Sequence, residues 1–222
     1  MNQNAPMNKE TDVLVIAAHP DDAELAIGGF ISYLTNNSVK VTILNFTVSE
    51  VDDTSREKRI AAATKAAAIL NANLDWGNNQ KLDQVEDLLN YACTKEVDRI
   101  VSLYNPKIVI THTDIDSHTD HVMLSKAVLS SSRRWNADIY AFQPNEHKSP
   151  VYQSFQPNFF IDITKYAQKK YDAIDCYNYN SANFRKLNID SIRKLDAARG
   201  VLCGYEYAEG LKIIRKRGIN FL

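Results

Sequence analysis

The sequence lacks the features that mark several large classes of protein. Its 222 residues include three cysteines, whose odd number and spacing fit neither a disulfide framework nor a CxxC metal site. No apolar run approaches the roughly 18 residues of a membrane span. Residues 1–10 have no apolar core like that of a signal peptide. A net charge of −1 gives no basis for binding nucleic acid or an anionic membrane. These absences predict a reduced, cytoplasmic protein without either of those partners.

Several catalytic and cofactor motifs are missing as well. The sequence contains neither a GxSxG elbow nor a Walker A motif. After the first apolar run it reads "AAHPDD", where a dinucleotide-binding domain would carry GxGxxG. Cys93 and Cys176 lack the histidine partner of a cysteine nucleophile. The sequence therefore disfavours a dinucleotide cofactor and a cysteine nucleophile.

What is present is an alternation of apolar runs and helical patterns. Strands are predicted at 12–18, 39–46, 107–111, 137–142 and 159–163. Helices are predicted at 23–34, 56–70, 84–104, 120–131, 166–173 and 189–199. This order indicates an α/β protein with a mostly parallel sheet and helices on both faces. The length suits one domain over residues 1–222, with a flexible start at 1–10.

A first polar cluster, "HPDD", follows the first predicted strand. His19 and Asp22 are three residues apart and can converge on one point as the chain turns into a helix, whereas Asp21 points differently. Histidine with a carboxylate suits Zn²⁺ or another divalent metal. The simpler alternative is that Asp21 or Asp22 caps the next helix and His19 is an ordinary loop residue. Glu24 is expected to be a structural hydrogen-bonding group. This stretch alone leaves both interpretations open.

A second cluster, "THTDIDSHTDH", begins where the strand at 107–111 ends. It places His118 and His121 on either side of Asp120, while His112 at the strand end is expected to be an inner residue. Because the carboxyl ends of parallel strands form one edge of a sheet, we expect this cluster beside "HPDD". The alternative is a solvated loop with a capping aspartate. Two strand ends that both carry histidine and aspartate favour a site.

Together the two clusters predict a catalytic metal site. Three side chains would bind the ion and leave a coordination position open, as catalytic zinc requires: His19, Asp22 and His121. The metal would lower the pKa of a water molecule and polarise a carbonyl, with Asp21 as the general base on that water. His118 would stabilise the oxyanion or the leaving amine. Asp120 would orient a histidine through its second ring nitrogen.

"AHPDDAELAIGG" followed by "DSHTDH" resembles the LmbE-like, PIG-L family of zinc-dependent N-acetylglucosaminyl de-N-acetylases, most of all the bacterial branch that includes deacetylases of bacillithiol biosynthesis. Further similarity lies in "FFIDITKYAQKKYDAI", with Asp162 and either Lys169 or Lys170 in register, and in "RGVLCGYEYAEGL", which contains Glu209. The resemblance implies a Rossmann-like fold and the same roles for both clusters, with His118 and Asp120 assisting the tetrahedral intermediate. It implies a small N-acetylated amino sugar or conjugate as the substrate. Homo-oligomers occur in the family, so the resemblance allows one here, although nothing in the sequence shows an interface.

The sequence departs from the family pattern where substrate would be recognised. The family's GExGxRG reads "SEVDDTSREKR" here, which keeps Glu50 and offers Arg56 in place of the missing arginine. The family's HxSQ reads "YNYN", which makes Tyr177 and Asn180 further candidate substrate contacts. An amidohydrolase acting on another N-acylated compound, such as an antibiotic or natural-product intermediate, is therefore an alternative. A non-catalytic metal-binding or sugar-binding module is another, but such a site needs no free base like Asp21.

Overall fold

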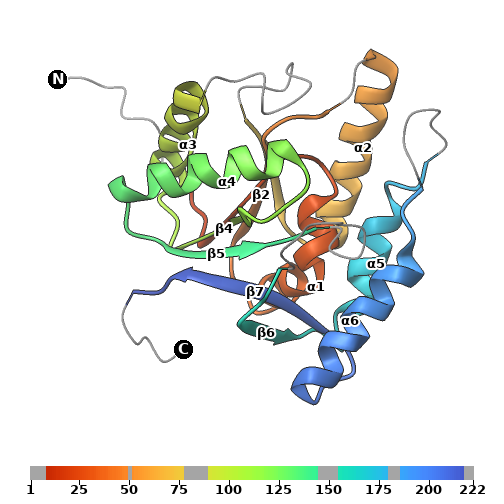
Figure 1. Cartoon of the computed structure of the whole chain (residues 1–222). Coiled ribbons are helices and arrows are strands. Elements are labelled where there is room, and N and C mark those ends of the chain that lie inside the picture. Colours follow the sequence, from red (N-terminus) through yellow and green to blue (C-terminus); the bar gives the residue numbers. More distant parts are fainter. Residues whose placement is uncertain (1–8, 50–51, 78–89, 145–154, 180–185, 218–222) are drawn as a thin grey trace.

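A seven-stranded sheet carries helices on both faces in the computed structural model (Figure 1). The structure describes residues 9–49, 52–77, 90–144, 155–179 and 186–217. The strand order is β3-β2-β1-β4-β5-β7-β6, and β1 to β5 are parallel. The predicted α/β class, with a mostly parallel sheet between two layers of helices, is confirmed. No helix within the described ranges is long and apolar enough to cross a membrane.

The predicted elements are found, with ends that differ by a few residues. The strands are β1 Val13–Ala17, β2 Val41–Asn45, β3 Asn73–Trp76, β4 Ile108–His112, β5 Asp138–Phe142, β6 Phe159–Asp162 and β7 Ala208–Arg215. The helices are α1 Asp22–Asn36, α2 Asp53–Ile69, α3 Asn90–Tyr104, α4 Thr119–Ser131, α5 Ala167–Asp175 and α6 Ile189–Cys203, with a short 3-10 helix, η2, at Ser132–Arg134. Residues 84–89 of the predicted third helix lie outside the described residues.

Two strands were not predicted from the sequence. β3 falls in a segment that we expected to be a loop, and it reads "NLDW", too short and polar to show a clear alternation. It is a strand because it pairs along its whole length with β2. β7 contains Gly210, which weakens a strand pattern. A Cβ atom there would lie 2.8 Å from the Cβ of Pro157, so packing requires glycine. Because β7 pairs antiparallel with β5 and β6, this end of the sheet is antiparallel.

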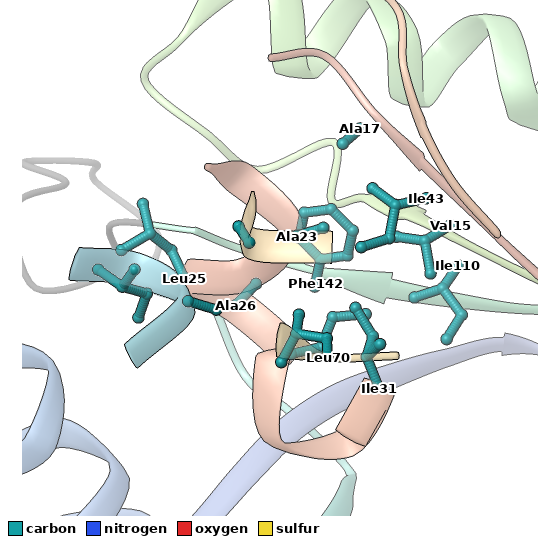
Figure 2. Close-up of a cluster of buried hydrophobic side chains, with 14 of the residues drawn as sticks. Val15, Ala17, Ala23, Leu25, Ala26, Ile31, Ile43, Leu70, Ile110 and Phe142 are labelled. Atoms are coloured by element: carbon teal, nitrogen blue, oxygen red, sulfur yellow. The ribbon is translucent and has the colours of Figure 1, made fainter. Parts of the chain in front are cut away.

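Alternating side chains of the central strands form two separate cores. On one face Val13, Val15 and Ala17 of β1 pack with residues of α1, α2, α5 and α6. Figure 2 shows part of this cluster, where Val15, Ile43 and Ile110 of three strands lie near Ile31 of α1. On the other face Leu14 and Ile16 pack against α3 and α4. Burial of both faces explains why β1 is a continuous apolar run in the sequence.

The strand order changes direction at β1. The chain passes from β1 to its neighbour β2 on one side, and β4 lies on the other side. In open sheets of this kind, ligands bind beside the carboxyl ends of the strands at such a switch point. The segments that leave β1 and β4 there lead into α1 and α4, whose first turns lie close together (Figure 1). The fold thus brings the two polar clusters to one edge.

Helix α1 is kinked at Ile27, and a carboxylate from β7 accepts hydrogen bonds from the backbone N–H groups after the kink. Ile27 has non-helical φ and ψ values of −142° and 24°. Glu209 accepts hydrogen bonds from the backbone N–H groups of Gly29, at 2.9 Å, and Phe30, at 2.7 Å. A carboxylate in this position satisfies donors as an N-cap does at the start of a helix.

Lys170 of α5 neutralises this carboxylate. Its Nζ lies 2.9 Å from Glu209 Oε1 and 2.9 Å from Asp196 Oδ1, and Tyr171 donates a hydrogen bond to the other oxygen of Asp196. The three charged side chains are at most 1% exposed. A buried charge that loses its partner typically costs about 3–5 kcal/mol. The two C-terminal segments that resemble the family therefore hold α1 in place.

Candidate functional site

The turn between β1 and α1 holds Asp21 in an unusual backbone conformation. Asp21 precedes the first residue of α1 with a φ of 95° and a ψ of −26°, in the left-handed region. Aspartate and asparagine tolerate this region better than most residues with a side chain. The Asp21 side chain caps none of the described N–H groups of α1. The interpretation of Asp21 as a helix cap is therefore wrong, and its carboxylate is available for another role.

The structure brings the three predicted metal ligands together around Asp22. Oδ1 of Asp22 lies 3.3 Å from Nε2 of His121, and Oδ2 lies 3.4 Å from Nδ1 of His19. Oδ2 also accepts a hydrogen bond from the backbone N–H of His19 at 2.8 Å. All three residues are buried, at 4% exposure or less. Asp22 and His121, 99 positions apart in the sequence, thus share one small polar centre.

Each of these two histidines has one ring nitrogen held by a second carboxylate. Nε2 of His19 lies 2.7 Å from Oδ2 of Asp120, which leaves Nδ1 on the side of Asp22. Nδ1 of His121 lies 3.0 Å from Oδ2 of Asp116, which leaves Nε2 on the side of Asp22. That Nε2 has no hydrogen-bond partner among the described residues. A metal-binding histidine commonly donates its other N–H to a carboxylate in this way.

The partners of these histidines differ in part from the expected ones. Asp120 contacts a ring nitrogen of a histidine, as predicted, and this histidine is His19. Asp116, which orients His121, was not singled out in the sequence. Asp116 lies in the loop before α4, five residues before His121. Neither the helix period nor the strand period places residues five apart side by side. Only the folded loop brings these two side chains together.

The remaining histidines of the site occupy different positions. Nε2 of His112 accepts a hydrogen bond from the backbone N–H of Ala18 at 2.9 Å, and its ring stacks on His121 with centroids 4.1 Å apart. His112 is fully buried, as expected of an inner residue. His118 is exposed and caps α4, since its Nδ1 accepts the N–H of Asp120 at 3.2 Å.

Among the described residues, two sets of three have ligand atoms within 4.8 Å of one another and could hold a metal ion. They are His19, His118 and His121, and Asp22, His112 and His121. The predicted trio shares two members with each set. In the second set, the lone pair on Nε2 of His112 already accepts the N–H of Ala18. A metal ion bound through that nitrogen would displace a buried hydrogen bond, which disfavours the second set.

Burial and neighbouring charges set the pKa values of the site. Burial raises the pKa of Asp21 to about 6, although Arg59 opposes this shift. Burial opposes ionisation of Asp22 too, but His121 and His112 hold its pKa well below its usual value. Burial would lower the pKa of His121, but Asp22 and Asp116 raise it to about 10. A metal ion at Nε2 of His121 would therefore compete with a proton.

Arg59 of α2 approaches the Asp21 carboxylate. Its guanidinium lies 3.5 Å from Oδ1 of Asp21, and it donates hydrogen bonds to the carbonyl oxygens of Pro20, at 3.0 Å, and Ser49, at 3.2 Å. Arg56, the predicted substitute for the family's arginine, lies one turn earlier and is half-buried. Arg59 shares the buried stripe of α2 with Ala62, Ala63 and Ala66, and this helical spacing was the signal for it.

Of the other three predicted substrate contacts, Tyr177 lies within the described residues. Tyr177 is fully buried, and its hydroxyl donates a hydrogen bond to Oε1 of Glu24 at 2.9 Å. It has no surface open to a substrate, so its prediction as a direct contact is corrected to a support for Glu24. Glu24 is itself fully buried, and burial raises its pKa to about 7. Glu50 and Asn180 lie outside the described residues, and their predicted contacts stay predictions.

The chain is similar to several known proteins. The chain is 25% identical to diacetylchitobiose deacetylase from Thermococcus kodakarensis over 237 residues, which cover 95% of this chain and 86% of that protein. It is 22% identical to a probable N-acetyl-alpha-D-glucosaminyl L-malate deacetylase 2 from Bacillus anthracis, over 77% of this chain and 82% of that protein. The crystal structure of 4-carboxy-2-hydroxymuconate hydratase from Pseudomonas putida has a TM-score of 0.75 at 19% identity, with 96% of this chain and 99% of that chain covered.

A family profile decides the membership. The PIG-L profile, described as GlcNAc-PI de-N-acetylase, matches residues 14–132, more than half of the chain. The matched segment begins in β1 and ends just after α4, so it contains both polar clusters and the loops that carry them. The predicted resemblance is confirmed, and the chain belongs to the PIG-L (LmbE-like) family of de-N-acetylases.

Proposed function

We propose that this protein is a zinc-dependent hydrolase that removes the acetyl group from an N-acetylated amino sugar or its conjugate. One observation carries the proposal: Asp22 faces Nδ1 of His19 and Nε2 of His121, while the carboxylate of Asp21, which does not cap the helix, lies in the next position. A site that only binds a metal ion needs Asp22, His19 and His121 alone. A hydrolase also needs a base beside them, and Asp21 is that base.

The donor set fits zinc. His19, Asp22 and His121 would hold the ion, since two imidazole nitrogens and one carboxylate are zinc's usual ligands in catalytic sites. Nε2 of His121 is an additional sign, because it makes no hydrogen bond with the described residues and a buried polar atom rarely lacks one. When bound, the ion would lower the pKa of a water molecule and polarise the amide carbonyl.

Two groups of the chain would move or hold protons. Asp21 would take a proton from the attacking water, and its pKa of about 6 leaves it ionised and basic at neutral pH. His118 is exposed as a residue, but partial burial of its ring, together with His121 and His19, lowers its pKa and favours the neutral form. Since Nδ1 of His118 accepts a backbone N–H, its proton belongs on Nε2. His118 would donate that proton in a hydrogen bond to the developing oxyanion.

The experiment is a release assay on the zinc-loaded protein. We expect acetate and free amine from at least one of N-acetylglucosamine, diacetylchitobiose and a malate or inositol conjugate of N-acetylglucosamine. Release from an acylated antibiotic aglycone but from no sugar would favour the alternative amidohydrolase. Zinc binding without release from any of these would favour a binding module. Because one structural neighbour is a hydratase, water addition to 4-carboxy-2-hydroxymuconate is assayed in parallel, and turnover there alone would contradict the proposal.

Arg59 is expected to keep Asp21 in its working position. Replacing Arg59 with methionine removes the guanidinium beside Asp21 and its hydrogen bonds to two carbonyl oxygens. Since a small displacement of a catalytic group lowers a rate by about 10²-fold, we expect a fall of that size in kcat. Arg56→Met on the same helix is the matched variant and tests the predicted substrate contact at Arg56. A larger loss in Arg56→Met than in Arg59→Met, measured by acetate release, would reverse the assignment.

A further inference from the structure

We propose that Asp116 is a positioning residue that directs the Nε2 atom of His121 toward the metal ion. The inference rests on the proposed zinc site and concerns a side chain that makes no contact with zinc or substrate itself. This role explains why Asp116, a loop residue outside the proposed ligand set, has a buried carboxylate. The Asp116 side chain is 7% exposed, although Asp114, two residues earlier in the same loop, is exposed.

Both oxygens of Asp116 are used within the loop that joins β4 to α4. Oδ1 accepts the backbone N–H of His118 at 2.9 Å. Oδ2 lies 3.0 Å from Nδ1 of His121, which is in the first turn of α4. One carboxylate therefore fixes the entry of the loop into the helix and the rotation of the histidine ring. A charge-assisted hydrogen bond of this kind is stronger than a neutral one.

The position of the ring proton is what makes this contact important. His121 lies between two carboxylates, with Asp116 at Nδ1 and Asp22 at Nε2. A neutral imidazole has one N–H, and the nitrogen without it is the one that can bind a metal ion. With the metal ion bound, Asp116 would keep the N–H on Nδ1 and leave the lone pair of Nε2 for the ion. Without Asp116, the carboxylate of Asp22 would still face Nε2 and would favour the N–H on that nitrogen.

His19 has the reverse arrangement, which shows that the pattern is not a general property of the site. Asp120 holds Nε2 of His19, so Nδ1 is the nitrogen that faces Asp22. The two histidines thus approach Asp22 through different ring atoms, and each has its own orienting aspartate. This pairing assigns Asp116 to His121 and Asp120 to His19, and neither aspartate can replace the other without a change of ring nitrogen.

The test compares Asp116→Asn with Asp114→Asn. Asparagine keeps the size of the side chain and an oxygen for the N–H of His118, but its amide would point an N–H at Nδ1 of His121. We expect zinc affinity, measured by competition with a chelator, to fall about 10- to 100-fold in Asp116→Asn. Asp114→Asn removes the same charge from an exposed position and is expected to match the wild type. Asp116→Glu keeps the carboxylate and is expected to recover part of the affinity.

A second measurement uses the wild-type protein loaded with zinc. We expect ¹⁵N NMR to show His121 with a proton on Nδ1 and the metal on Nε2. Metal on Nδ1 would overturn the inference whether or not the variants fold. Unchanged affinity in Asp116→Asn, or an equal loss in Asp114→Asn, would overturn it too. Failure of the wild type to bind zinc would instead overturn the proposed metal site, and this inference with it.

Discussion

Asparagine in place of Asp21 is expected to lower kcat about 10³-fold while the protein keeps its zinc, because general-base catalysis typically contributes about 10²- to 10⁴-fold. Asp21 lies beside the proposed ligands, and its carboxylate makes an ionic contact with Arg59. An amide in its place cannot accept a proton from water at neutral pH. The ligands His19, Asp22 and His121 remain unchanged, so zinc content measured by elemental analysis is expected to match the wild type.

Asparagine is the right substitution because of the backbone. At a φ of 95°, alanine would add strain, whereas asparagine tolerates left-handed conformations about as well as aspartate. A rate loss in Asp21→Asn then reports on the carboxylate and not on a distorted turn. Comparison of Tm values for the metal-free proteins checks this. Full activity of Asp21→Asn on a substrate that the wild type deacetylates would show that another group is the base.

Alanine in place of His19 is expected to remove both zinc and activity. Structural zinc sites bind with about 10–16 kcal/mol, so one of a few ligands accounts for about 3–5 kcal/mol, or roughly a 10²- to 10⁴-fold change in affinity. The loss is enhanced because Asp22 and Asp120 would lose the imidazole between them. We expect no acetate release above that of wild-type protein stripped with a chelator, and wild-type activity should return when zinc is added back.

His147→Ala is the control for the loss of a histidine. In the sequence His147 lies outside both polar clusters, so its removal is expected to leave zinc content and acetate release unchanged. Retention of a full equivalent of zinc by His19→Ala would exclude His19 from the ligand set. It would then favour a site built from Asp22, His112 and His121, the second set that the geometry brings together.

The sequence was sufficient for the elements whose own residues carry the signal. β1 and β4 are buried on both faces, and they read as apolar runs. The histidines and aspartates follow those runs directly, and parallel strands end at one edge, so their convergence was predictable. β3 and β7 were missed because their pairing partners, and not their own patterns, make them strands.

The sequence was not sufficient to predict which side chains contact one another across different segments of the chain. Arg56 and Arg59 are both at the start of one helix, and the choice between them depends on which face of α2 meets the sheet. Asp116 is paired with His121 by the path of a loop, which has no periodicity to read. The burial of Tyr177 against Glu24 brings together residues 153 positions apart.

By itself the sequence determined the α/β class, the two polar clusters and the residue types that suit a metal and a base. These follow from local rules, because alternation, apolar runs and strand ends are properties of neighbouring residues. The tertiary structure alone decided which nitrogen of each histidine faces Asp22, which aspartate holds the other nitrogen, and which arginine lies beside Asp21. Those choices depend on distances of a few ångströms between segments far apart in the chain, and such distances are fixed only when both cores pack around the sheet.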